Sequence, residues 1–153
     1  MTYEEAMAYI KEAEKLGSKP GLNSIRNLLS RLDNPQDKIK TIHVAGTNGK
    51  GSTISFIAGI LATAGYRVGI YISPVVFTYR EKLQLISLDR QKDKDDRLQA
   101  EYISEEDVSQ SIEIIKSACD DMVLEGLAHP TAFEIETAMA FIYMLKKQVD
   151  FLI

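Results

Sequence analysis

The sequence predicts an α/β fold in which helices flank a parallel sheet. The main observation is the order of three apolar runs: residues 40–45 read as a buried strand, 52–64 as a helix and 67–72 as a second strand. A strand, a helix and a strand within about 30 residues form a βαβ unit, which implies parallel pairing and a right-handed crossover. The second observation is size, because 153 residues with 45% apolar residues suffice for a buried core.

Charge and cysteine content exclude several other classes of protein. The 18 Lys and Arg residues against 22 Asp and Glu residues argue against a basic nucleic-acid binder. The only cysteine is Cys119, which excludes a disulfide scaffold and fits a reducing cytoplasm. The most apolar stretch, residues 54–65, is too short to cross a membrane, and the N-terminus does not resemble an export signal. We therefore expect a cytoplasmic protein with no membrane or nucleic-acid partner.

Two helices are expected before the first strand. Residues 2–16 begin with Thr2 and Glu5 at capping-box spacing and continue with apolar residues on one helical face. Residues 25–32 form a second, short helix, and the turn-forming residues 33–35 end it.

The chain after the second strand is expected to combine charged and apolar segments. Residues 82–86 read as a short strand, and residues 88–103 as a charged loop insertion, with an acidic interaction surface as the alternative. Three further elements complete the prediction: a helix over residues 104–126 with Cys119 on its apolar face, a helix from the capping-box pair Thr131 and Glu134 to residue 147, and a buried strand over residues 149–153.

A glycine-rich turn joins the first strand to the apolar helix. It comprises Gly46, Thr47, Asn48, Gly49, Lys50, Gly51, Ser52 and Thr53. Glycines let successive backbone N–H groups face one point, and together with the positive end of the helix they bind an anion such as phosphate. Lys50 adds a mobile positive charge, and the hydroxyl of Ser52 or Thr53 can bind a Mg²⁺ that bridges the phosphates.

The strand before this turn and the helix after it predict a P-loop NTPase-like fold, although the residues of the turn depart from the usual G-x-x-x-x-G-K-[ST] pattern. Val44 stands where the first glycine of that pattern belongs, and Gly51 separates the lysine from the serine. A glycine-rich helix start that binds nothing is the alternative.

The run from His43 to Ser52, His-Val-Ala-Gly-Thr-Asn-Gly-Lys-Gly-Ser, resembles the ATP loop of folylpolyglutamate and dihydrofolate synthases, which are relatives of the Mur cell-wall ligases. Residues 21–36, 65–74 and 131–141 resemble the same family, so the resemblance covers nearly the whole chain except the charged loop. The glycine after the lysine points to its folate branch. The resemblance implies a Mur-ligase-type central domain, of which residues 1–153 are the N-terminal part.

The resemblance also implies an activity. In such ligases a substrate carboxylate takes the γ-phosphoryl group of ATP, and the amino group of L-glutamate attacks the acyl phosphate to form an amide. The resemblance implies ATP and Mg²⁺ as cofactors, residues 46–53 as the nucleotide site, Lys50 as the catalytic residue, and Ser52 and Ser73 as Mg²⁺ ligands. Ser73 follows the second strand at its carboxyl end, where open α/β sheets bind ligands.

The implied substrates are L-glutamate and a folate or dihydropteroate. Gly21, Leu22, Thr131 and Phe133 match family positions near the pterin, although a core or capping role is equally open for each. Full-length members are expected to act as monomers.

The sequence departs from the family at two places after Ser73. Val75-Val76 stands where the family has His-Leu, and Lys82 stands where the family has arginine, whose planar fork lysine lacks. In the family the acidic Mg²⁺ ligand and the glutamate-binding C-terminal domain follow the strand 149–153. We therefore expect a domain that is incomplete at its C-terminus and inactive alone. The alternatives are a Mur-type amino-acid ligase and a non-catalytic nucleotide-binding remnant.

Overall fold

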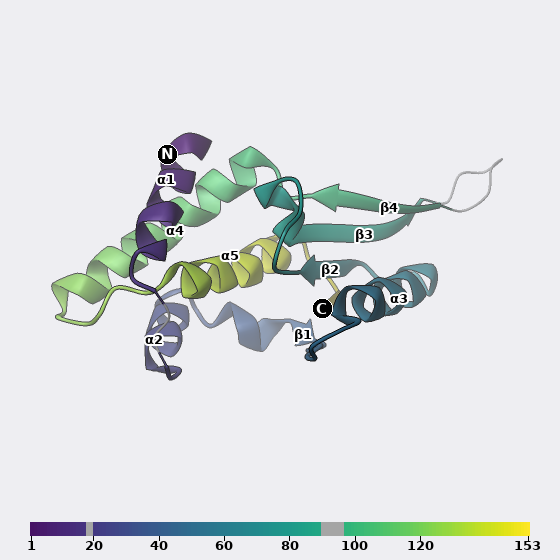
Figure 1. Cartoon of the computed structure of the whole chain (residues 1–153), viewed down its shortest axis with the longest axis horizontal. Helices are drawn as coiled ribbons and strands as arrows, with labels where there is room; N and C mark the ends of the chain where they lie inside the picture. The colour runs from purple at the N-terminus through teal and green to yellow at the C-terminus, as the bar shows by residue number, and fades with distance from the viewer. Residues whose placement is uncertain (18–19, 90–96) are drawn as a thin grey trace. The chain divides into compact units, whose positions relative to one another are not determined.

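The computed structural model describes residues 1–17, 20–89 and 97–153. These residues form two compact units. The helical unit comprises Met1–Lys38 and Ser104–Lys146, and the sheet unit comprises Ile39–Ile103 and Lys147–Ile153. Figure 1 shows the strands and α3 in the sheet unit and the other long helices in the helical unit.

The sheet of the sheet unit has five strands in the order β1-β5-β2-β3-β4. Their bounds are Lys40–Thr41 for β1, Val68–Tyr71 for β2, Leu83–Asp89 for β3, Arg97–Tyr102 for β4 and Phe151–Leu152 for β5. β5 pairs in parallel with both β1 and β2, whereas β3 is antiparallel to both β2 and β4. The α/β prediction is therefore confirmed, but the sheet is mixed, and β5 separates the two strands that we expected to pair directly.

The predicted strand over residues 40–45 is short and not buried. Lys40, Thr41 and His43 are exposed, while Ile42 and Val44 are partly buried and pack against the apolar core under α3. The backbone N–H of Ile42 donates to the carbonyl of Leu152 at 2.8 Å, so pairing continues one residue past β1. β1 is an edge strand among the described strands, and only alternate side chains turn inward because successive side chains of a strand point to opposite faces of the sheet.

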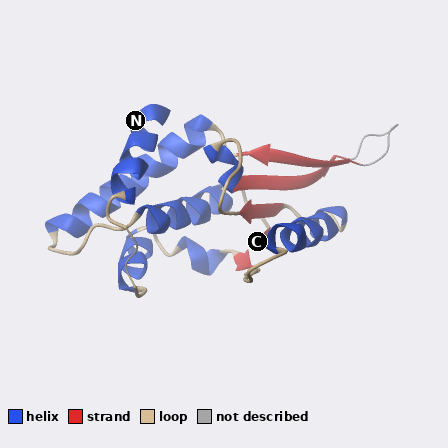
Figure 2. Ribbon diagram, in the orientation of Figure 1, coloured by secondary structure: helices blue, strands red, loops and turns tan. Residues whose placement is uncertain are grey.

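The helix α3, Lys50–Thr63, packs against the sheet, as Figure 2 shows. Small residues on its inner face allow a close approach, and the buried core there comprises Ile54, Ala58, Ala62, Val68, Ile70, Ile86 and Ile153. Gly65 ends the helix with a φ of +95°, and the N–H of Tyr66 donates back to the carbonyl of Leu61 at 3.0 Å. The predicted helix over residues 52–64 is thus confirmed, with its start two residues earlier.

The charged insertion predicted as a loop over residues 88–103 is in part a β-hairpin. Leu88 and Asp89 end β3, and Arg97–Tyr102 form β4, which pairs with β3 from Gln84↔Tyr102 to Asp89↔Arg97. All six residues of β4 are exposed, so the alternation of burial that marks a strand in a sequence is missing. Residues 90–96 of the predicted loop lie outside the described residues.

The helical unit contains α1 (Tyr3–Glu14), α2 (Asn23–Arg31), α4 (Glu105–Leu124) and α5 (Ala132–Lys146), with a short 3₁₀ helix at Pro35–Lys38. The capping box of Thr2 and Glu5 forms as predicted, and the hydroxyl of Ser104 accepts the N–H of Asp107 at the start of α4. Within the described residues, each helix is too short or too polar to cross a membrane.

Cys119 lies in the core of the helical unit, as its position on the apolar face of α4 predicts. Its side chain is fully buried, and burial is the main cause that raises the pKa of its thiol to about 11. The Tyr9 hydroxyl forms a hydrogen bond with Nε2 of His129 at 3.0 Å, and burial raises the pKa of Tyr9 as well. The Cys119 thiol and the Tyr9 hydroxyl are therefore held in their neutral forms.

Candidate functional site

The glycine-rich turn begins α3 with two unusual backbone conformations. Gly46 has a φ of +156° and Gly49, the N-cap of α3, has a φ of +76°, both of which favour glycine. The first helical hydrogen bond runs from the N–H of Thr53 to the carbonyl of Gly49 at 3.0 Å. The amides of Lys50, Gly51 and Ser52 therefore precede the helical ladder and have no partner within it. Amides of this kind, at the positive end of a 14-residue helix, can bind an anion.

Lys50 folds back over the turn that precedes it. Its Nζ donates to the carbonyl oxygen of Gly46 at 2.5 Å, so the side chain spans the glycine-rich segment. The ammonium group and the helix amides thus belong to one local structure, as the sequence predicts. A phosphate group that enters this structure would replace the Gly46 carbonyl as the partner of the ammonium.

Ser52 and Ser73 lie at the same edge of the sheet. The turn with Ser52 follows β1, and Ser73 follows β2. Both strands run parallel to β5, so their carboxyl ends lie at one edge, with β5 between them. Both serines are exposed, and neither hydroxyl forms a hydrogen bond with another described residue. This edge is where open α/β sheets bind ligands.

The residues at this edge suit Mg²⁺ only together with phosphate. Among the described residues, no three His, Cys, Asp or Glu side chains cluster so as to hold a metal ion. Serine hydroxyls are hard oxygen ligands of the kind Mg²⁺ accepts, and Mg²⁺ commonly takes its other ligands from phosphates and water. The donor set therefore fits a magnesium–nucleotide complex rather than a free metal ion.

The four predicted substrate residues all belong to the helical unit. Gly21 has a φ of +103° in the turn before α2, and Leu22, the N-cap of that helix, is 58% exposed. Thr131 is buried at the start of α5, whereas Phe133 in its first turn is 67% exposed. The buried capping threonine and the two exposed apolar side chains thus lie in different environments.

A pocket of about 230 Å³ in the helical unit brings part of this set together. It is lined by Pro20, Gly21, Asn23, Ser24, Asn27, Met122, Leu127, Ala128 and Glu134. Gly21 is thus in its wall, and Thr131 reaches it through Glu134. Leu22 and Phe133 are not among the lining residues.

Glu134 holds this pocket together. Its Oε2 accepts the Thr131 N–H at 2.7 Å, the Ser24 hydroxyl at 3.0 Å and the Thr131 hydroxyl at 3.1 Å, which joins the start of α2 to the start of α5. Its side chain is buried, and each of these three bonds uses Oε2 rather than Oε1. The sequence assigns Glu134 only a capping role, and its part in the pocket depends on Ser24, 110 residues away.

Comparison with known proteins finds relatives along almost the whole chain. A dihydrofolate synthase/folylpolyglutamate synthase of Bacillus subtilis is 37% identical over 152 residues, which cover 99% of this chain and 32% of the relative. A folylpolyglutamate synthase structure from Thermotoga maritima matches with a TM-score of 0.79 and 41% identity, over 98% of this chain and 32% of that one. An FPGS–AMPPCP–folate complex matches with a TM-score of 0.78 and 31% identity, over 99% and 34%.

The chain therefore spans about a third of the length of these relatives. No protein-family model matches the sequence. The relatives nevertheless resemble this chain over nearly its whole length, in sequence and in fold. Their names place them in the folate branch that Gly51 indicates. The chain belongs to the folylpolyglutamate synthase and dihydrofolate synthase family.

Proposed function

We propose that the chain forms the nucleotide-binding part of an ATP-dependent ligase that joins L-glutamate to the carboxylate of a folate or dihydropteroate. The observation that carries this proposal is the start of α3, where unpaired helix amides, two glycines with positive φ and the Lys50 ammonium lie together and would form one anion site. Relatives that match nearly the whole chain are named dihydrofolate synthase/folylpolyglutamate synthase and folylpolyglutamate synthase.

Residues of the sheet unit would bind the phosphates of ATP, each in a different role. The segment Gly46, Thr47, Asn48, Gly49, Lys50, Gly51, Ser52 and Thr53 would hold the phosphates of ATP. Lys50 would act as the catalytic cation that balances charge on the γ-phosphoryl group during its transfer to the substrate carboxylate. The hydroxyls of Ser52 and Ser73 would bind Mg²⁺, which neutralises and orients the phosphates when it is bound.

The residues of the helical unit would bind the substrate. The pocket beside Gly21 combines an acidic group with hydroxyl and amide side chains, which suits a heterocycle with N–H donors such as a pterin. Thr131 would act by holding the Glu134 carboxylate, and Leu22 and Phe133 would add apolar contacts. As a domain assignment, residues 1–153 would be the N-terminal part of the ATP-binding domain, and glutamate would bind to residues outside this chain, which is about a third as long as its relatives.

Calorimetric titration with Mg·ATP tests the proposal. The chain is expected to bind, and Lys50→Ala is expected to weaken binding by about tenfold or more, because a charge-assisted hydrogen bond contributes about 1.5–3 kcal/mol. Lys11→Ala, which removes a lysine in α1 of the helical unit, is the matched control and should bind as the parent does. Absence of binding, unchanged in Lys50→Ala, would instead support a non-catalytic remnant.

A further inference from the structure

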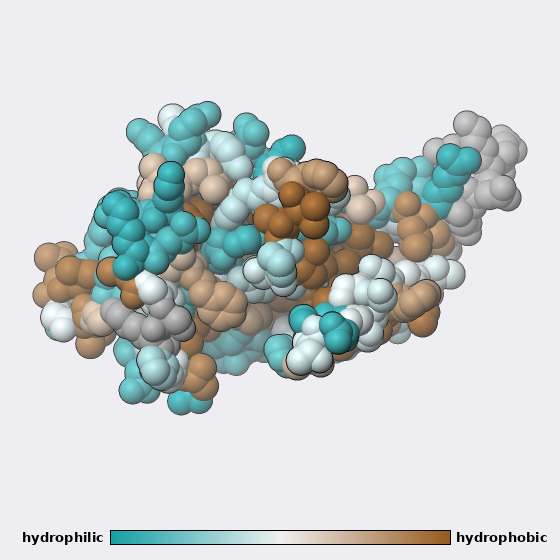
Figure 3. All heavy atoms as spheres, in the orientation of Figure 1, coloured by the Kyte–Doolittle hydropathy of each residue, from teal (hydrophilic) through white to brown (hydrophobic). Residues whose placement is uncertain are grey.

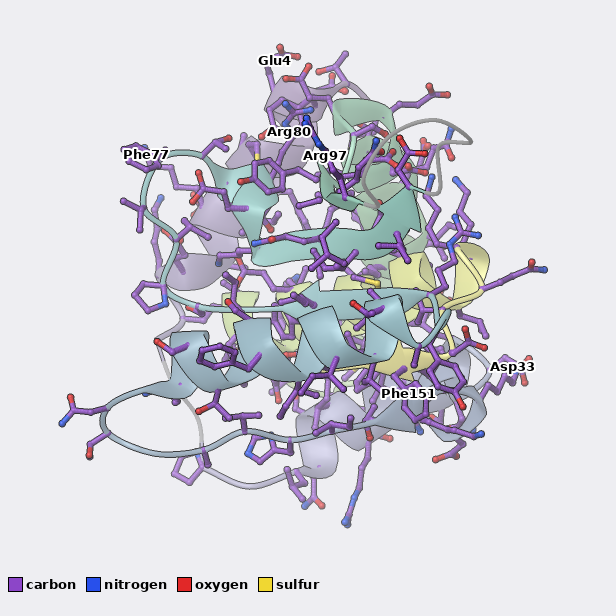
Figure 4. The ribbon with its side chains drawn as sticks, turned by 90° about the vertical axis from the view of Figure 1, so that its right-hand side faces the viewer. Glu4, Asp33, Phe77, Arg80, Arg97 and Phe151 are labelled. Carbon is purple, nitrogen blue, oxygen red and sulfur yellow. The ribbon has the colours of Figure 1, made fainter. Side chains whose placement is uncertain are left out.

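The outer side of β4 is open to another strand. β4 is the last of the described strands in the sheet order, and all six of its residues, Arg97–Tyr102, are exposed. Figure 3 shows hydrophilic and hydrophobic side chains together over this part of the sheet unit, and Figure 4 shows Arg97 at the end of the sheet away from Phe151. An edge strand of this kind presents a row of N–H and C=O groups with which a further strand can pair.

The hydrogen bonds of the β3–β4 hairpin determine which backbone groups of β4 face outward. Ile103, directly after β4, donates its N–H to the carbonyl of Leu83 in β3 at 2.9 Å. The backbone groups of an antiparallel strand point alternately to its two sides, so the odd-numbered residues of β4 bond to β3. The N–H and C=O groups of Leu98, Ala100 and Tyr102 therefore face the open side.

The charged side chains of β4 are spaced so that the strand is complementary to itself. Arg97 and Glu101 project from one face of the sheet, with Gln99 between them. When a second β4 lies antiparallel about Gln99, Arg97 of each copy stands opposite Glu101 of the other. In this register the outward backbone groups of Leu98 bond to those of Ala100. Both ion pairs then occupy non-hydrogen-bonded positions, where opposite side chains are closest.

Other registers lack this complementarity. The outward backbone groups meet only when the strand shifts by an even number of residues, because a shift by one residue turns them away. A shift by two residues places Arg97 or Glu101 opposite the neutral Gln99. A shift by four residues places Arg97 opposite Arg97, or Glu101 opposite Glu101, and like charges directly opposite each other destabilise a strand pair. Charge therefore selects one register among those that the backbone allows.

The opposite face of β4 also favours this pairing. Leu98 projects there beside Gly59 of α3, since its Cδ1 lies 3.5 Å from the position that a Cβ of Gly59 would take. Leu98 is nevertheless 51% exposed, so contact with Ala100 of a second copy would remove apolar surface from water. Charged side chains commonly protect an edge strand from pairing. Charges of one sign repel a second copy, whereas β4 carries one charge of each sign at the spacing that attracts it.

We propose that two copies of this chain associate through β4, with the two strands antiparallel about Gln99. Each copy contributes the same strand, so the interface is symmetric and joins the two sheets into one. Full-length relatives are expected to act as monomers, but β4 belongs to the charged segment 88–103, which the family resemblance leaves out. The inference concerns this chain and does not depend on the proposed function.

Sedimentation velocity from micromolar to millimolar concentrations of the chain measures this association. We expect a reversible equilibrium between monomer and dimer, whose Kd rises about tenfold or more in Glu101→Arg, because both symmetry-related ion pairs become repulsive. Arg97→Glu combined with Glu101→Arg exchanges the two charges and should restore the dimer. Glu14→Arg, at the exposed end of α1, makes the same change of net charge and should dimerise as the parent chain does.

Hydrogen exchange verifies that each variant keeps its hairpin. Arg97 lies opposite Asp89 within the hairpin, so exchange of charges on β4 also changes the contacts inside one chain. The amide of Ser87 faces β4, and its protection from exchange shows that β3 and β4 remain paired.

A disulfide between copies tests the register. Gln99 lies on the twofold axis, so Gln99→Cys places two thiols opposite each other, with their Cα atoms about 4.5 Å apart and within the range of a disulfide. In Tyr102→Cys the two equivalent residues are offset by six positions, about 20 Å along the strands, which excludes a bridge. The natural cysteine, Cys119, is buried. We expect a glutathione redox buffer to bridge Gln99→Cys and not Tyr102→Cys.

Each outcome decides the proposal. A monomer at every concentration, or a Kd that is equal in Glu101→Arg and Glu14→Arg, would overturn association through β4. A double exchange of charges that does not restore the dimer while Ser87 stays protected would exclude the two ion pairs. Absence of a bridge in Gln99→Cys, or equal bridging in Tyr102→Cys, would exclude pairing about Gln99.

Discussion

Removal of the Glu134 carboxylate should destabilise the helical unit by about 1.5–4 kcal/mol. In Glu134→Ala the Thr131 N–H loses its acceptor, and since Thr131 is 4% exposed this buried donor costs about 1–3 kcal/mol. The hydroxyl of Ser24 is only partly buried and can turn to water, so its loss adds about 0.5–1 kcal/mol. The two terms together give the expected range.

The assay is urea unfolding followed by exchange of amides in α2 and α5, which reports on the helical unit rather than on the whole chain. Glu134→Gln keeps one carbonyl oxygen and should lose about 1 kcal/mol. Glu101→Ala removes an exposed glutamate from β4 and should change stability by less than about 0.5 kcal/mol. If Glu134→Ala is no less stable than Glu101→Ala, the hydrogen bonds between α2 and α5 do not stabilise the unit, and the reasoning is wrong.

Three further predictions concern protonation, the thiol and catalysis. Desolvation acts to raise the pKa of Glu81, but three backbone N–H groups hold that pKa below its usual value of 4.5. The stabilising effect of the ionised Glu81 carboxylate should therefore be complete above pH 4.5 and disappear as pH falls through the lowered pKa. Hydrogen exchange of the Phe77 amide, one of these three groups, measures this effect. Loss of protection already at pH 6 would contradict the lowered pKa. Cys119 should resist iodoacetamide at pH 8 in the folded chain and react in urea, because its thiol is buried with a pKa of about 11. Equal alkylation rates in the folded chain and in urea would refute the buried position. The chain alone should form no amide from ATP, folate and L-glutamate, and steady turnover by the pure 153-residue chain would disprove this expectation.

Local elements could be predicted because their signals are local. The capping box of Thr2 and Glu5 and the cap at Ser104 each depend on side chains within one helical turn. Gly65 ends α3 because glycine adopts a φ of +95° without strain. The start of α3 could also be predicted from the sequence, because a strand, two glycines and a lysine occur there in order.

The strand order could not be predicted, because it depends on contacts between distant residues. β5 enters between β1 and β2 from more than 70 residues away, and nothing in residues 40–72 indicates the insertion. β4 could not be predicted either, because an edge strand with every side chain exposed carries no alternating pattern of apolar and polar residues.

Glycines, caps and a lysine at fixed spacing act through the backbone nearest to them, so the sequence alone predicts the type of fold, a candidate anion site at the start of α3 and the resemblance to folate ligases. Which distant residues lie together depends on the packing of the whole chain. It placed Ser52 and Ser73 at one sheet edge by setting their strands parallel to β5. It also joined Ser24 to Glu134, because hydrogen bonds between distant segments form only when the packing of helices brings buried donors and acceptors together.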